Sequence, residues 1–131
     1  MSSTPRGTPP QPPFAWGDFR RVAKQLHSPA GDEARLRSAI SRAYYGCFNE
    51  TKSWLASHGV TIPKDDVHTF VWSTIGGFGN DGRRAKYQGR ALRIRRNIAD
   101  YDAPATAAWD SEAADAFQKS ETISILLAGM P

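Results

Sequence analysis

The most regular spacing of apolar residues in the chain extends from about Asp32 to His58 and predicts a long core helix. Apolar or small side chains recur there at steps of three or four, which places them on one face of an α-helix. They are Leu36, Ile40, Ala43, Cys47, Thr51, Trp54 and His58, and Tyr44, Phe48 and Leu55 widen the stripe. Asp32 and Glu33 suit the positive N-terminal end of this helix, and Gly59 suits the position past its last turn.

A line of polar residues follows the other side of the same segment at helical spacing. It consists of Ser38, Ser41, Arg42, Tyr45, Asn49 and Lys52. This line either faces solvent or lines a cleft or a dimer seam.

Two shorter segments flank the core helix. A short helix begins near Asp18, and its inward side is Phe19, Val22, Ala23 and Leu26. A further helix starts at Pro63, which suits a first helical position, and carries Asp65 and Asp66 in its first turn. Its apolar face, ending near Ile75, is Val67, Phe70, Val71 and Ile75.

Glycines at positions 76, 77, 79 and 82 indicate a loop before the next helix. That helix ends near residue 101, and its inward side is Tyr87, Ala91, Ile94, Ile98 and Tyr101. The last helix starts near Asp110 or Ser111 and ends at Gly129, and it buries Ala113, Ala116, Phe117, Ile123 and Leu127. Because no stretch alternates with a period of two, the sequence predicts an all-α, up-and-down bundle of four main helices plus a short N-terminal helix.

Composition divides the chain into a tail and one domain. Residues 1–13 contain five of the nine prolines and are predicted to form a flexible tail, whereas residues 14–131 are long enough for one helical domain. No apolar run approaches the roughly 18 residues of a membrane span, and the N-terminus lacks the apolar core of a secretory signal. The single cysteine, Cys47, fits a reducing cytoplasm.

Positive charge is concentrated in residues 83–96. Seven basic residues and no acidic residue lie there, namely Arg83, Arg84, Lys86, Arg90, Arg93, Arg95 and Arg96. Because the chain has 17 basic and 13 acidic residues, the remainder holds ten basic against thirteen acidic ones. Guanidinium groups suit bidentate contact with phosphate. The interpretation is a face for RNA or another anionic ligand, and the alternative is a merely solvated basic face.

Within this helix Arg93, Arg96 and Asp100 share one face, with Asn97 and Tyr101 beside them. The structural alternative for Arg96 and Asp100 is an ordinary surface ion pair, worth about 0.3–0.5 kcal/mol. Other chemistries are not indicated. The three histidines are far apart in sequence and no CxxC, HxxxH or GxSxG pattern exists, so neither a metal site nor a cofactor is predicted.

Two blocks of sequence resemble the HEPN domain family of prokaryotes. Residues 36–48, LRSAISRAYYGCF, are similar to the R-x-x-x-SRAYYA-x-F core helix of these domains. Residues 92–102, LRIRRNIADYD, resemble their second signature, in which an arginine and a polar residue precede an ADYD-type end. The resemblance spans about residues 16–128. It implies an all-α dimer in toxin–antitoxin or phage-defence systems, often paired with a nucleotidyltransferase antitoxin.

The resemblance also implies a site. Many HEPN proteins are metal-independent endoribonucleases that use an arginine, a polar residue and a histidine. Arg96 and Asn97 match the first two, but Asp100 or Tyr101 stands where the histidine belongs, and Asn49 stands at a second common histidine position. His68 supplies an imidazole only if its helix reaches the same cleft.

The expected function is therefore RNA engagement with RNA as partner, with or without ribonuclease activity. The predicted catalytic set is Arg96, Asn97, Asp100 and Tyr101, and the predicted RNA-binding set is Arg90, Arg93, Arg42 and Tyr45. The alternative is a non-catalytic dimerisation or protein-interaction module. A further hypothesis makes Tyr101 the target of modification by a nucleotidyltransferase partner.

Overall fold

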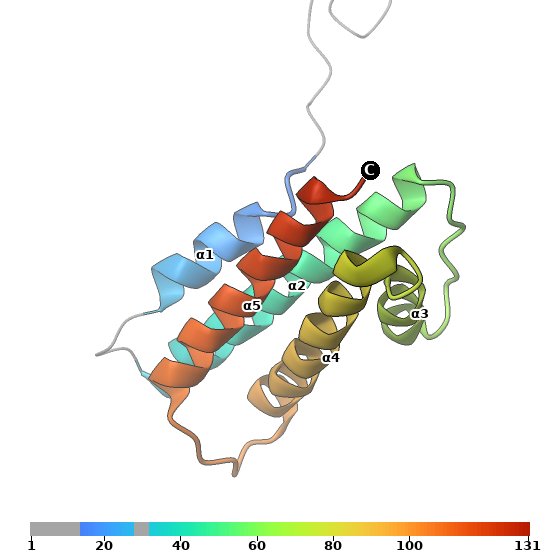
Figure 1. The fold of residues 1–131 in the computed structure, drawn as a ribbon. Coiled ribbons are helices and arrows are strands. Elements are labelled where there is room, and N and C mark those ends of the chain that lie inside the picture. The colour runs from blue at the N-terminus through green and yellow to red at the C-terminus, as the bar shows by residue number, and fades with distance from the viewer. Residues whose placement is uncertain (1–13, 28–31) are drawn as a thin grey trace, which may run out of the picture.

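The computed structural model describes residues 14–27 and 32–131, and within them the chain forms five α-helices and no strand. The helices are α1 (Asp18–Leu26), α2 (Glu33–Ser57), α3 (Val67–Ile75), α4 (Gly79–Tyr101) and α5 (Trp109–Gly129). Figure 1 shows α1, α2, α4 and α5 alternating in direction along the bundle, with α3 beside one end of α4. The predicted all-α bundle is confirmed. The proline-rich segment 1–13, predicted as a tail, lies outside the described residues.

The long helix α2 is the centre of the bundle, because it packs against each of the other four helices. Its N-cap residue Asp32 accepts a hydrogen bond of 2.9 Å from the backbone N–H of Arg35, which satisfies a free donor of the first turn. Gly59 follows the helix with φ 85°, a left-handed conformation that glycine adopts without strain.

The predicted apolar stripe of α2 forms the core. Its buried members are Leu36, Ile40, Ala43, Tyr44, Cys47, Phe48, Thr51 and Leu55. Trp54 is half-buried. The prediction is wrong for His58, which is exposed because it caps the C-terminus and stacks on Trp54 with ring centroids 3.6 Å apart.

The start of α3 differs from the prediction by four residues, because the helix begins at Val67 and not at Pro63. The residue before it, Asp66, has φ 51° and ψ 37°, a left-handed conformation from which a right-handed helix can begin only at the next position. The helix ends at Ile75 as predicted. Its inward face includes Trp72, which is 1% exposed and which the apolar pattern had not selected.

The helix α4 begins at Gly79, inside the predicted loop, and approaches α3 through glycines. A Cβ atom at Gly82 would overlap the carbonyl oxygen of Ile75, and one at Gly89 would overlap the indole ring of Trp72. These two positions therefore need glycine for close approach, and neither belongs to a loop. The buried side of α4 consists of Gly82, Ala85, Gly89, Leu92, Arg96 and Ala99.

The predicted inward side of α4 is wrong for three of its five residues, whereas Ala91 and Ile98 are half-buried and Ile98 packs against the core. Tyr87, Ile94 and Tyr101 are 63%, 61% and 76% exposed. The prediction chose the side of α4 that carries large apolar residues. The helix instead packs through small residues, which allow neighbouring helices to come close. Tyr87, Ile94 and Tyr101 follow one another at intervals of seven residues and form an exposed line, which we call the outer α4 stripe.

The two remaining helices agree with the sequence analysis. In α1, Ala23 is buried and Phe19, Val22 and Leu26 are half-buried. The last helix, α5, begins one residue before Asp110 and buries Ala113, Ala116, Ile123 and Leu127, with Phe117 half-buried.

Candidate functional site

Arg96 is a buried charged residue at the centre of the candidate site. The helical spacing that defines the buried side of α4 also turns Arg96 inward, where it is 5% exposed. Its guanidinium carbon lies 5.2 Å from the ring centroid of Tyr44, 5.1 Å from that of Tyr45 and 5.8 Å from that of Tyr101. A cation over aromatic faces is attracted by the ring quadrupoles, so the three tyrosines hold Arg96 in place.

The guanidinium of Arg96 makes no hydrogen bond to any residue that the structure describes. Its Nε is buried and unpaired, and its Nη1 lies 3.7 Å from Oδ2 of Asp100, which is beyond hydrogen-bond reach. Asp100 instead accepts a hydrogen bond of 3.1 Å from the hydroxyl of Ser41. The alternative of an ion pair between Arg96 and Asp100 is therefore present at 3.7 Å, but it is not an ordinary surface pair, because Arg96 is buried. A buried charge without hydrogen bonds opposes folding, and Asp100 offsets this one only in part. The Nη1 and Nη2 atoms of Arg96 are not among the fully buried unpaired atoms, so these two donors are left for a ligand.

His68 enters the same region from α3. Its ring stacks on Phe48 with centroids 4.2 Å apart and on Tyr44 with centroids 5.6 Å apart. Its Nδ1 lies 2.6 Å from the hydroxyl of Tyr44. Burial, followed by the positive charges of Arg93 and Arg96, lowers the pKa of His68 to about 4. The imidazole is therefore neutral at pH 7 and near both arginines, which answers the question that the sequence left open.

Two other predicted residues lie on the same side of α4, facing α3. Nη1 of Arg93 donates a hydrogen bond of 3.3 Å to the hydroxyl of Thr69, and its Nε is buried without a partner. Nη2 of Arg90 donates a bond of 3.1 Å to the hydroxyl of Ser73 on the more exposed surface. Arg93 is thus partly buried close to Arg96, whereas Arg90 lies about one helical turn before Arg93 on the more exposed surface.

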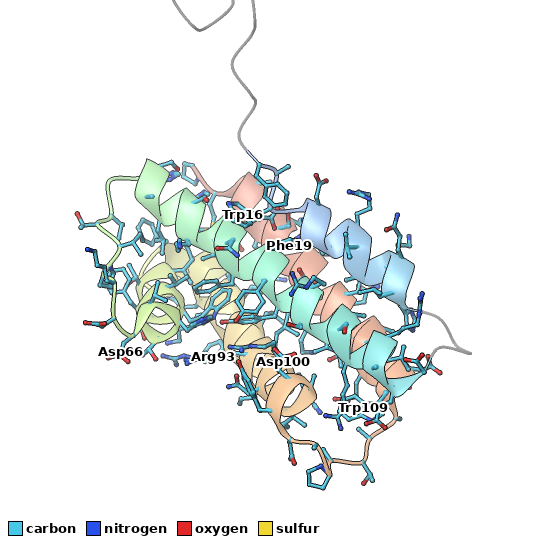
Figure 2. The ribbon with its side chains drawn as sticks, turned by 180° about the vertical axis from the view of Figure 1, so that it is seen from behind. Trp16, Phe19, Asp66, Arg93, Asp100 and Trp109 are labelled. Atoms are coloured by element: carbon cyan, nitrogen blue, oxygen red, sulfur yellow. The ribbon has the colours of Figure 1, made fainter. Side chains whose placement is uncertain are left out.

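We define the Arg96 cluster as Arg93, Arg96 and Asp100 of α4, Tyr101 at the end of α4, Ser41, Tyr44 and Tyr45 of α2, and His68 of α3. Figure 2 shows Arg93 and Asp100 on one side of α2 and Phe19 on the other. The predicted residue Arg42 lies on the Phe19 side, with its guanidinium carbon 5.1 Å from that ring. Two other predicted residues, Asn97 and Tyr101, are exposed at the surface beside Arg96.

The two blocks that resemble the family signatures meet in space through Arg37. This side chain donates hydrogen bonds to carbonyl oxygens at the end of α4 and in the loop after it, at distances of 2.9–3.3 Å. The acceptors are Ala99, Asp102, Ala103 and Ala105. Arg37 thereby satisfies free carbonyls of the last turn and fixes the position of Asp100 and Tyr101. Its spacing in the sequence does not reveal this role, because the acceptors are backbone atoms.

The other basic residues of segment 83–96 are partly neutralised. Arg84 lies 3.6 Å from Asp81, and Arg95 pairs with Glu112 of α5. Among the described residues, Arg83, Lys86, Arg90 and Arg93 have no acidic partner. Unpaired positive charge therefore extends along α4 towards the Arg96 cluster.

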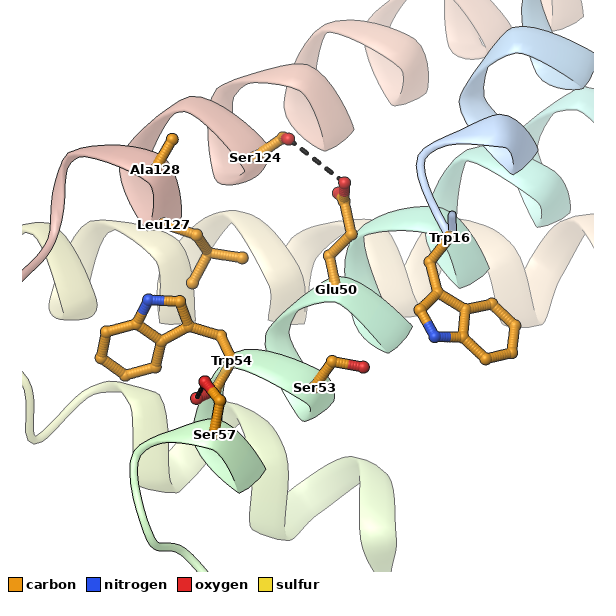
Figure 3. Close-up of a pocket in the computed structure, with 8 residues that line it drawn as sticks. All are labelled: Trp16, Glu50, Ser53, Trp54, Ser57, Ser124, Leu127 and Ala128. Atoms are coloured by element: carbon orange, nitrogen blue, oxygen red, sulfur yellow. Dashed lines mark hydrogen bonds between the residues drawn. The ribbon is translucent and has the colours of Figure 1, made fainter. Parts of the chain in front are cut away.

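A hollow of about 490 Å³ lies between α2, α5 and the residues before α1, away from the Arg96 cluster. Figure 3 shows Trp16 and Trp54 at its two sides and Glu50 between them. The carboxylate of Glu50 is already occupied, because it accepts hydrogen bonds from Arg20 and from the hydroxyl of Ser124. This hollow contains none of the predicted site residues.

Residues 14–27 and 32–131 contain no group of three His, Cys, Asp or Glu side chains placed to hold a metal ion. In the same residues, no helix has the length and apolar character needed to cross a membrane. Comparisons with protein-family models, with curated proteins and with solved structures found no significant match.

Proposed function

We propose that this chain is a HEPN-like domain of a bacterial toxin–antitoxin or phage-defence system and that it engages RNA through the Arg96 cluster. The observation that carries the proposal is the guanidinium of Arg96, which makes no hydrogen bond to a described residue and whose Nη1 and Nη2 are not among the fully buried unpaired atoms. Arg93, nearly one helical turn away, has an unpaired buried Nε. A guanidinium group suits bidentate contact with a phosphate, and the burial of Arg96 means that its charge is already largely desolvated.

The aromatic residues of the cluster favour a single-stranded ligand. Tyr45 is half-buried and Tyr101 is 76% exposed, so both rings have faces on which an unpaired base can stack. Recognition of single-stranded RNA commonly combines such stacking with arginine contacts to the backbone. The cluster contains both elements within one short surface.

The test is binding of a fluorescently labelled single-stranded RNA to the wild type and to Arg93→Ala/Arg96→Ala. We expect the double variant to bind at least tenfold more weakly, because it loses two charge-assisted contacts. The control is Arg21→Ala/Lys24→Ala, which removes the same net charge from exposed positions of α1. Equal affinity of the wild type and the α4 variant would overturn the proposal, provided that circular dichroism shows both to be helical.

Metal-independent endoribonuclease activity is the stronger form of the same proposal. Cleavage needs stabilisation of charge on the phosphate, which Arg96 supplies, and a group that removes the proton of the 2′-hydroxyl. The predicted catalytic residues Asn97, Asp100 and Tyr101 include no histidine, but α3 contributes His68 to the cluster. Incubation of RNA with the protein in excess chelator tests this form. Fragments that disappear with Arg96→Ala support it, and intact RNA excludes it.

An alternative of another class is a non-catalytic dimerisation module, and the outer α4 stripe favours it. Large apolar side chains at intervals of seven residues on an exposed face are typical of a helix that packs against another helix. A homodimer formed through this stripe would bring two Arg96 clusters together, because Tyr101 belongs to both features. Ile94→Arg should convert the dimer to a monomer in light scattering. The control Ile125→Arg, at a residue 66% exposed on α5, should leave it dimeric. A monomeric wild type would exclude the dimer.

The exposure of Tyr101 also supports the hypothesis that a nucleotidyltransferase partner modifies it. With 76% of its surface exposed, its hydroxyl is accessible to a second protein. Co-expression with a candidate nucleotidyltransferase should add the mass of a nucleotidyl group to the wild type and not to Tyr101→Phe. An unshifted mass would count against the hypothesis.

A further inference from the structure

A chain of three hydrogen-bonding side chains joins the core to the Arg96 cluster. Nε1 of Trp72 donates a hydrogen bond of 3.0 Å to the hydroxyl oxygen of Tyr44, and the same oxygen lies 2.6 Å from Nδ1 of His68. Trp72 and Tyr44 are at most 1% exposed. The three residues come from α2 and α3, so the bonds also fix the orientation of α3.

The chemistry of these groups gives the chain a direction. An indole N–H is a donor only, so the oxygen of Tyr44 must accept from Trp72. The single proton of Tyr44 then has one acceptor within reach among the described residues, Nδ1 of His68. Burial raises the pKa of Tyr44, so that its hydroxyl keeps this proton. Nδ1 is therefore an acceptor, and the proton of the neutral imidazole sits on Nε2.

Nε2 of His68 is left as a donor for a ligand. It makes no hydrogen bond to any residue that the structure describes, and it is not among the fully buried unpaired atoms. The charged groups that lower the pKa of this imidazole are all positive, with Arg93 and Arg96 on α4 and Lys52 on α2. The carboxylate of the cluster, Asp100, lies 3.7 Å from Arg96 and accepts a hydrogen bond from Ser41. His68, Arg93 and Arg96 are all hydrogen-bond donors, and His68 is the neutral one, which Tyr44 holds in place. Such a group of donors favours binding of an anion.

We propose that His68 is a neutral hydrogen-bond donor to a phosphodiester oxygen that Arg93 and Arg96 hold, and that Trp72 and Tyr44 fix it in this role. The proposal rests on the proposed function and deepens it, because it identifies the RNA phosphate as the group recognised. It also has a consequence for chemistry. An imidazole whose Nε2 carries a proton cannot take another there, so His68 does not serve as the general base of RNA cleavage. Cleavage by the cluster would then need another group to remove the proton of the 2′-hydroxyl.

The first test is the tautomer of His68 in the full wild-type chain, measured at neutral pH by long-range ¹H–¹⁵N NMR correlations. We expect the neutral form with the proton on Nε2. In Tyr44→Phe, which removes the hydroxyl but keeps the ring, the fixed tautomer should be lost. A proton on Nδ1, or a positively charged ring, in the wild type would overturn the proposal without any RNA present.

The second test is affinity for a labelled oligouridylate. His68→Ala should bind roughly tenfold more weakly, the effect of one hydrogen bond to a charged group. His68→Gln should stay within about threefold of the wild type, because its amide N–H replaces the donor. The control is His58→Ala, which removes an exposed histidine outside the cluster and should bind like the wild type.

The outcomes separate the two proposals. If Arg93→Ala/Arg96→Ala loses affinity but His68→Gln is as weak as His68→Ala, the donor role is wrong and RNA binding stands. If the arginine variant keeps full affinity, the proposed function itself fails. The tautomer of His68 is measured in the wild type, so the donor role can be refuted even if a variant folds poorly.

Discussion

Replacing Arg37 with alanine should destabilise the protein more than replacing any exposed arginine, because this side chain joins the two sequence blocks. Its hydrogen bonds to the carbonyls of Ala99 and Ala105 are partly buried. The lower estimate for a hydrogen bond to a charged group is about 1.5 kcal/mol of stability, and we use it for each of the two bonds. Its guanidinium carbon lies 4.4 Å from the ring centroid of Trp109, which adds about 0.5–1 kcal/mol. The exposed bonds and the pair with Glu33 add little.

The expected loss in the free energy of unfolding is therefore about 3.5–4 kcal/mol. Urea titration of the helical circular dichroism signal measures it. The control is Arg35→Ala, two residues away on α2, which loses one exposed hydrogen bond to the carbonyl of Gln25 and should change stability by no more than about 0.5 kcal/mol. A loss for Arg37→Ala that equals the loss for Arg35→Ala would refute the view that Arg37 fixes the end of α4.

Three further predictions concern packing and titration. Gly89→Ala should cost about 1–3 kcal/mol of unfolding free energy despite the better helix propensity of alanine, because its Cβ overlaps Trp72, whereas Gly129→Ala, with open space around it, should not destabilise. Burial and the nearby arginines lower the pKa of His68 from 6.5 to about 4, so the unfolded chain takes up this proton at higher pH than the folded chain. Its contribution to stability is thus present above pH 6.5 and is lost as the pH falls to about 4, and urea midpoints should fall less steeply over this range in His68→Gln. Burial also raises the pKa of Cys47 to about 12, so an alkylating reagent at neutral pH should modify this thiol only after unfolding, and rapid modification of the native protein would contradict its burial.

The core helix could be predicted from the sequence because large apolar residues recur along its buried face at helical spacing. The same reasoning failed for α4, where the buried side is made of glycine, alanine, one leucine and Arg96. Hydrophobic patterns weight large side chains, whereas Gly82 and Gly89 are buried because neighbouring atoms approach their backbone closely. The start of α3 was misplaced for a local reason, since Asp66 adopts a left-handed conformation that no spacing rule foresees.

The candidate site was predictable in part for similar reasons. Helical spacing correctly grouped Arg93, Arg96 and Asp100 on one helix and placed Tyr45 on another, but spacing within a helix does not tell which side a partner helix covers. Arg42 therefore faces α1 while Tyr45, three residues on, faces Arg96. The bond between His68 and Tyr44 joins residues 24 positions apart and follows from the packing of α3 on α2.

The central claim is that Arg93 and Arg96 contact RNA phosphates, and the salt dependence of RNA affinity tests it most directly. For single-stranded RNA, each phosphate contact contributes about 0.7 to the slope of log K against log salt concentration. Removing both arginines should reduce the magnitude of that slope by about 1.4, whereas Arg21→Ala/Lys24→Ala should leave it unchanged. Equal slopes for the wild type and Arg93→Ala/Arg96→Ala would show that the two arginines do not contact phosphate and would contradict the claim.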